Sequence, residues 1–301
     1  MPHAGTDSEQ WREVVRLGAD LRGLAGVRGS RVRAEVALVW DWESYWALEL
    51  DWRPSVDLAF RERVDAFYEA LWREHVTVDF VHPSADVSGY RVVVAPSSYL
   101  LTEASAKNLH RYVESGGNLF VSYFSGIVDE HDTIHPGAHP GALRELLGLS
   151  IEEFHPLREH ETVTLTGDGT LGARVWSERV RPAGAVAVRE FASGPDAGHP
   201  ALTRHDLGAG TAWYLATAPV TGLRDLLAQV LDHAGVSRPR GLPDTLELVR
   251  RGGHVFLINH GDEPVTVEGV TGVSVFDGVR HDGPVTVAPG AVTVVVDTPR
   301  P

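Results

Sequence analysis

The chain has 301 residues, of which 43% are hydrophobic and 23% charged, and its formal net charge is −14. This composition is that of a globular protein and excludes a disordered or collagen-like chain. The acidic balance argues against a nucleic-acid binder, which needs concentrated Lys and Arg to neutralise phosphates. No apolar run approaches the roughly 20 residues that span a bilayer, so we expect no membrane partner.

Cysteine is absent from the sequence. This excludes a disulfide, a thiolate nucleophile and a cysteine-ligated zinc site. The N-terminal residues show no basic segment followed by an apolar one, as a secretory signal would. Both observations favour a cytoplasmic location.

Residues 1–30 are predicted to form a short helical lead-in. Its apolar residues recur at spacings of three and four, which is typical of one apolar helix face: Trp11, Val14, Val15, Leu17, Leu21 and Leu24. The segment is too small to fold alone, so this face must pack on another part of the protein.

Residues 31–238 alternate predicted strands with predicted helices. Apolar runs predict strands at 34–40, 76–81, 91–95, 118–123, 185–191 and 211–216. Helical patterns begin at Pro54-Ser55, at Thr102 and at Val220; Thr102 is a good N-cap, and the Gly116-Gly117 pair ends its helix. Strands separated by helices are parallel, which predicts an open, flavodoxin-like α/β sheet covered on both faces. Residues 141–181 fit this pattern less well and predict a small α+β insertion.

Residues 239–301 consist of short alternating segments separated by turn signals such as Gly261-Asp262, Asp277-Gly278 and Pro289-Gly290. The pattern predicts a small antiparallel β-sandwich.

The most unusual segment runs from Trp40 to Trp52 and holds four of the eight tryptophans and four carboxylates. It follows a predicted strand, where open α/β sheets place ligand crevices. Indole rings can stack on a sugar while carboxylates accept hydrogen bonds from its hydroxyls. The same aromatics can instead anchor a subunit interface. The candidate residues for either role are Asp41, Trp42, Glu43, Trp46 and Glu49.

Two other segments contain residues that could carry chemistry. Ser125 follows a predicted strand, but Tyr123 and Ile127 occupy the glycine positions of a nucleophile elbow, so the motif fails. The loop 129–139 gathers three histidines and three acids. Its prolines and lack of helical spacing favour a solvated polar loop over a metal site.

Several motifs occur in one order along nearly the whole chain and resemble family-42 glycoside hydrolases, the β-galactosidases. The segment 37–49 resembles the motif that opens their middle, trimerisation domain. Further similar segments lie at 89–96, 112–118, 123–129 and 140–154, and residues 2–7 resemble the exit from the catalytic barrel. Ser44 and His131 depart from the asparagines that the family usually has there.

The resemblance implies a fold similar to class I glutamine amidotransferases without their chemistry, because their cysteine nucleophile is missing here. The family's catalytic glutamates lie on an N-terminal (β/α)8 barrel, and a barrel alone needs about 250 residues. We therefore carry over no catalytic residue. We expect no cofactor and no metal, because the family's cysteine zinc site also lies in the barrel.

The implied role is homotrimer assembly and shaping of a neighbouring active site, with a galactoside bound only where the barrel is present. Two alternatives stay open. One is a stand-alone hydrolase that uses Ser125 or the loop residues His131, Asp132 and His135. The other is a galactoside-binding module that uses Trp42 and Trp46.

Overall fold

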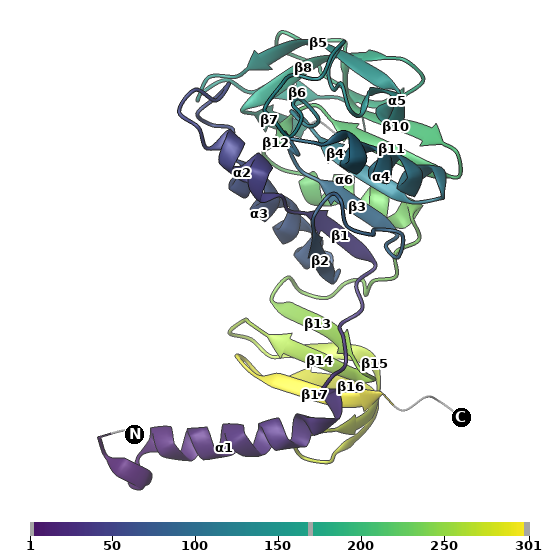
Figure 1. Ribbon diagram of the computed structural model, residues 1–301. Coiled ribbons are helices and arrows are strands. Elements are labelled where there is room, and N and C mark those ends of the chain that lie inside the picture. Colours follow the sequence, from purple (N-terminus) through teal and green to yellow (C-terminus); the bar gives the residue numbers. More distant parts are fainter. Residues whose placement is uncertain (1–2, 168–170, 298–301) are drawn as a thin grey trace. The chain divides into compact units, whose positions relative to one another are not determined.

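The computed structural model describes residues 3–167 and 171–297. It divides into two compact units, Ala34–Arg238 and Met1–Arg33 together with Pro239–Pro301 (Figure 1). The residues 1–30 that the sequence separates as a lead-in therefore cluster with the residues 239–301. No helix among the described residues is both long and apolar enough to cross a bilayer.

The larger unit is built on a seven-stranded sheet with strand order β2-β1-β3-β4-β11-β10-β9. The first five of these are parallel: β2 (Val78–Val81), β1 (Val36–Val39), β3 (Val92–Ala95), β4 (Asn118–Ser122) and β11 (Gly210–Leu215). Then β10 (Pro200–Leu207) and β9 (Val186–Glu190) continue the sheet in antiparallel fashion. Every residue of β1, β3, β4 and β11 is buried. This explains why their sequences are mostly apolar rather than alternating.

Helices cover both faces of this sheet. On one face, α3 (Phe60–Arg73) and α6 (Leu223–His233) pack on strand residues such as Leu38 and Val94. On the other, α4 (Glu103–Glu114) and α5 (Arg144–Leu147) pack on the alternate residues of the same strands, such as Val39 and Val93. Alternate side chains of a strand point to opposite faces, so each strand contributes to two cores.

The helix boundaries follow the local sequence. Thr102 caps α4 as predicted, because its hydroxyl accepts a hydrogen bond from the Ser105 N–H at 3.0 Å. The chain leaves α4 through Gly116, whose φ is +110°. A Cβ on Gly117 would lie 2.3 Å from the Tyr112 ring, so only glycine fits there. Helix α3 begins at Phe60, later than the predicted start at Pro54-Ser55, because residues 50–58 form turns.

The segment between β4 and β11 contains the predicted α+β insertion. In it, β5 (Leu149–Pro156) pairs with β8 (Trp176–Pro182), and β6 (Val163–Leu165) pairs with β7 (Leu171–Arg174). Strand β12 (Ala218–Pro219), which follows β11, adds to β7 and completes a three-stranded sheet. Strand β10 was missed from the sequence. It begins with a proline, and four consecutive polar residues, 203–206, precede its last residue, so it shows no clear strand pattern, although proline is tolerated at the first strand position.

The smaller unit has a five-stranded antiparallel sheet of order β13-β14-β17-β15-β16. Its strands are β13 (Leu246–Arg251), β14 (His254–Asn259), β15 (Val265–Ser274), β16 (Arg280–Val287) and β17 (Val292–Asp297). The sequence predicted a sandwich, and the described residues instead form a single five-stranded sheet with a core around residues such as Leu257 and Val287. Turn signals fix antiparallel pairing, but they do not show how strands divide into sheets.

The N-terminal segment holds the short 3-10 helices Gly5–Asp7 and Leu24–Val27 on either side of α1 (Glu9–Gly23). The Ser8 hydroxyl caps α1 by accepting a hydrogen bond from Trp11 N–H. None of the residues of α1 is buried, and Val14 and Leu21 are each 61% exposed. The predicted apolar helix face exists, but within this unit it is uncovered.

Candidate functional site

The carboxyl ends of strands β1 and β2 bring together the residues that follow them. These strands pair in parallel with Val39 opposite Val81, and Trp40 N–H donates to Val81 O at 2.9 Å. The next residues are Asp41 and His82, and His82 Nε2 lies 3.5 Å from Asp41 Oδ1. This edge of an open α/β sheet is where ligand crevices form.

Asp41 is the N-cap of α2 (Trp42–Leu48) and is only 2% exposed. Its Oδ1 accepts from Glu43 N–H, and its Oδ2 accepts from Ser44 N–H and, at 2.7 Å, from the Ser44 hydroxyl. The Ser44 hydroxyl oxygen also accepts from Leu100 N–H at 3.1 Å. Asp41 and Ser44 therefore join α2 to the loop after β3, a role for Ser44 that sequence reasoning missed.

Replacement of Ser44 by alanine is expected to destabilise the larger unit by about 1–2 kcal/mol, because the partly buried Leu100 N–H loses its partner. Urea unfolding measures the change. Ser115→Ala, at an exposed position after α4, is the matched control and should stay within about 0.5 kcal/mol of the parent. Equal stabilities for the two variants would show that Ser44 does not fix α2.

Glu43 lies in the first turn of α2, exposed and next to Asp41. A hydrogen bond with the Asp41 carboxyl raises the pKa of Glu43, since one of two adjacent carboxyls is favoured in its protonated form. Glu49, at the end of α2, lies 3.8 Å from Arg53 and forms an exposed ion pair with it. The two glutamates that sequence analysis grouped thus have different partners.

The aromatic residues of this segment divide into an inner and an outer group. Trp40 packs against Tyr45 and Phe60 with ring centroids 5.7 and 5.4 Å apart, and so belongs to the core. Trp42 and Trp46 lie one turn apart on α2 with centroids 6.1 Å apart, and they are 53% and 60% exposed. We call these two residues the tryptophan pair. Two large exposed apolar rings on one helix indicate a contact surface.

Ser125 has no access to solvent, because its exposure is 0%. Its hydroxyl donates to Ser122 O at 2.7 Å and accepts from Ser98 N–H at 3.0 Å. The left-handed residue of this turn is Phe124, with φ of +57°, rather than the serine. Ser125 is thus placed as a structural residue and cannot meet a substrate.

The histidine-rich loop 129–139 is organised by local turns. Asp129 accepts hydrogen bonds from His131 N–H and Thr133 N–H, which lowers the pKa of its carboxyl. His135 Nε2 lies 2.9 Å from Leu101 O. Within the described ranges, the side chains of this loop do not converge into a group with metal-ligand spacing.

Glu178 of β8 is a fully buried acid that the sequence did not single out. Its carboxyl accepts hydrogen bonds from Phe124 N–H at 3.1 Å, from Trp176 Nε1 at 3.0 Å and from the Tyr214 hydroxyl. Burial raises its pKa to about 7. Glu178 thereby holds Phe124 in its left-handed conformation, which costs of order 1 kcal/mol or more in a non-glycine residue.

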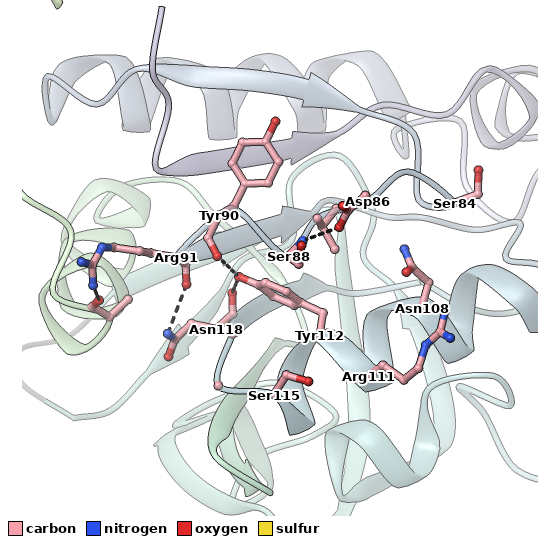
Figure 2. A pocket seen from close by; sticks show the side chains of 14 residues that line it. Ser84, Asp86, Ser88, Tyr90, Arg91, Asn108, Arg111, Tyr112, Ser115 and Asn118 are labelled. Atoms are coloured by element: carbon pink, nitrogen blue, oxygen red, sulfur yellow. Dashed lines mark hydrogen bonds between the residues drawn. The ribbon is translucent and has the colours of Figure 1, made fainter.

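A hollow of about 590 Å³ lies elsewhere in the larger unit, at the amino-terminal ends of β3 and β4 (Figure 2). Its polar groups already bond to one another: the Tyr112 hydroxyl donates to Tyr90 O and Asn118 O, and Asn118 Nδ2 donates to Arg91 O. Asn108 Nδ2 likewise donates to two backbone carbonyls. These bonds join helix α4 to the strands, so the carboxyl edge with Asp41 and the tryptophan pair is the better candidate.

Residues 34–237, almost the whole of the larger unit, match the family model described as the β-galactosidase trimerisation domain. The chain belongs to family 42 of the glycoside hydrolases. This confirms the family expected from the sequence motifs.

Curated family-42 relatives match along most of the chain. A β-galactosidase from Arthrobacter sp. is 43% identical over 303 residues, which cover 99% of this chain and 43% of that protein. The β-galactosidase LacZ from Heyndrickxia coagulans is 40% identical over 270 residues, which cover 87% of this chain and 41% of that protein. The chain spans less than half the length of these relatives.

Solved structures show the same correspondence. The β-galactosidase from Bacillus circulans sp. alkalophilus has a TM-score of 0.92 and 28% identity, covering 97% of this chain and 46% of that one. A catalytic mutant of a family-42 β-galactosidase from G. stearothermophilus has a TM-score of 0.90 and 26% identity, and the match covers 96% of this chain and 44% of that one. The mixed α/β architecture with a parallel-rich sheet and additional antiparallel sheets is that of these enzymes.

Proposed function

We propose that this chain is the non-catalytic, C-terminal region of a β-galactosidase and that it assembles the enzyme into a homotrimer. The match of residues 34–237 to the trimerisation domain carries this proposal. The intact enzyme hydrolyses terminal β-D-galactosides on a barrel outside this chain, and the larger unit shapes the active site of a neighbouring subunit. We assign residues 31–238 to trimerisation, 239–301 to the C-terminal domain and 1–30 to the connection with the barrel.

The larger unit is a flavodoxin-like domain in this proposal. Its five parallel strands run in the order β2-β1-β3-β4-β11, with helices on both faces. This order corresponds to the flavodoxin-like arrangement 2-1-3-4-5. A cytoplasmic location remains a prediction from the cysteine-free sequence.

The tryptophan pair is the proposed contact surface, with Asp41, Glu43 and Glu49 around it. Large aromatic residues dominate the energetics of subunit interfaces. Asp41 caps α2 with both of its oxygens, and we assign it no catalytic role.

Assays with nitrophenyl galactosides and nitrophenyl esters separate assembly from catalysis. The purified chain is expected to show no turnover above the buffer rate, and Ser125→Ala should leave that result unchanged. Turnover that Ser125→Ala abolishes would instead establish a stand-alone hydrolase. Calorimetry with galactose and lactose is the matching test for a binding module, and we expect no saturable heat from either sugar.

A further inference from the structure

Three side chains with metal-binding atoms meet at the carboxyl edge of the sheet. Asp41 follows β1, Glu43 lies in the first turn of α2, and His82 follows β2. One ligand atom from each residue lies within 4.8 Å of the other two. Among the described residues, no other group of three or more His, Asp and Glu side chains meets this spacing.

The distance between the buried carboxylate and the imidazole suits two ligands of one metal. Asp41 Oδ1 and His82 Nε2 are 3.5 Å apart, which is longer than a good N–H···O hydrogen bond. Two tetrahedral ligands, each about 2.1 Å from zinc, are about 3.4 Å apart. The pair is therefore nearly at coordination distance without backbone movement.

The surroundings combine one rigid ligand with two that can adjust. Asp41 is 2% exposed and is fixed by the α2 cap, whereas the His82 side chain is 50% exposed and Glu43 faces solvent. An ion can enter from the solvent side, and Glu43 can rotate onto it. The remaining positions would be filled by water.

The second nitrogen of His82 is also oriented. Its Nδ1 lies 2.7 Å from the Ser84 hydroxyl and 3.2 Å from Ser84 N. When a metal occupies Nε2, the ring proton is on Nδ1, and this N–H donates to the Ser84 hydroxyl oxygen. The hydrogen bond from the Ser84 backbone N–H to Nδ1 is then lost. Metal-bound histidines usually donate their other N–H to such an acceptor.

We propose that Asp41, Glu43 and His82 bind one divalent transition-metal ion of the Zn²⁺ type. One nitrogen and two carboxylate ligands suit Zn²⁺, whereas Mg²⁺ and Ca²⁺ prefer all-oxygen sites with six or more ligands. The bound ion joins α2 to the edge strand β2 and so fixes the helix that carries the tryptophan pair. The site was missed in the sequence because His82 is about forty residues from Asp41, and only the strand order brings them together.

Isothermal titration of the full chain with ZnCl₂, after treatment with EDTA, tests the site. The parent chain is expected to bind one ion that is lost in His82→Ala and bound at least tenfold more weakly by Glu43→Gln. The matched control is His131→Ala, in the exposed loop, which should bind as the parent does. Mg²⁺ should give no saturable heat at the same concentrations.

A spectroscopic and a stability measurement complete the test. Co²⁺ in place of Zn²⁺ should give visible absorption typical of a low-coordinate site in the parent and in His131→Ala, and none in His82→Ala. Zn²⁺ should raise the unfolding temperature of the same two proteins only. Zinc binding by His82→Ala with unchanged affinity and stoichiometry, or no saturable binding by the parent, would overturn the proposal. Neither result depends on whether the chain forms trimers.

Discussion

A chain that carries Trp42→Ala and Trp46→Ala is expected to sediment as a monomer at concentrations where the parent is assembled. The two rings are 53% and 60% exposed on one face of α2, so their apolar surface is available to a neighbouring subunit. Truncation of interface anchors typically costs about 2 kcal/mol each. A loss of about 4 kcal/mol lowers the association constant roughly a thousandfold. Sedimentation velocity over a range of concentrations measures the shift.

Phe276→Ala is the matched control for this experiment. Phe276 is an exposed aromatic residue, 40% exposed, that lies in the other unit of the chain. It should leave assembly unchanged. Trp42 also packs edge-on against Trp40, with ring centroids 5.1 Å apart, so its replacement can disturb local packing as well as assembly. The single variant Trp46→Ala leaves this contact in place and therefore tests assembly alone. An unchanged oligomer in the double variant would show that the pair is not an assembly surface.

Glu178→Ala is expected to cost about 3–5 kcal/mol of the free energy of unfolding. The substitution leaves a cavity, and it removes the acceptor of Phe124 N–H, Trp176 Nε1 and the Tyr214 hydroxyl, all of which are buried. Each buried group left unsatisfied costs about 1–3 kcal/mol. Glu178→Gln keeps a carbonyl acceptor for the N–H groups and an amide that can donate to Tyr214, so it should be far less destabilising.

The pH dependence of stability distinguishes these variants further. The pKa of Glu178 is about 7 in the folded chain and about 4.5 in the unfolded chain, so the folded state binds the extra proton. Its contribution is fully present below pH 4.5 and is lost as the pH rises to about 7, a change of about 3 kcal/mol.

Glu178→Gln should remove this dependence, and urea unfolding at pH 5 and pH 8 measures it. The exposed control Glu159→Gln should show the same change of unfolding free energy with pH as the parent. Identical slopes in the parent and in Glu178→Gln would contradict the assignment of this proton to Glu178.

Local sequence predicted most of the larger unit because its strands are buried on both faces. The runs of β1 and β3 are apolar at every position, and the Thr102 hydroxyl caps α4 as its position predicts. Strand β10 and the single sheet of the smaller unit were not predicted. The sequence of β10 lacks a clear strand pattern, and the turn signals of the smaller unit do not show which strands become neighbours.

The candidate site could be predicted only in part. The Trp40–Trp52 segment was found from its composition, but its division into a buried cap, core rings and an exposed pair depends on tertiary contacts. His82 and Ser44 gain their roles through strand β2 and the loop after β3, far away in the sequence. Glu178 resembles any surface acid in the sequence, and only its burial identifies it.

Sedimentation equilibrium of the purified chain determines whether it assembles into a trimer. We expect a species with three times the 32.7 kDa mass of one chain, in reversible exchange with the monomer on dilution. A single species with the mass of one chain, persisting at the highest concentrations that can be reached, would contradict it.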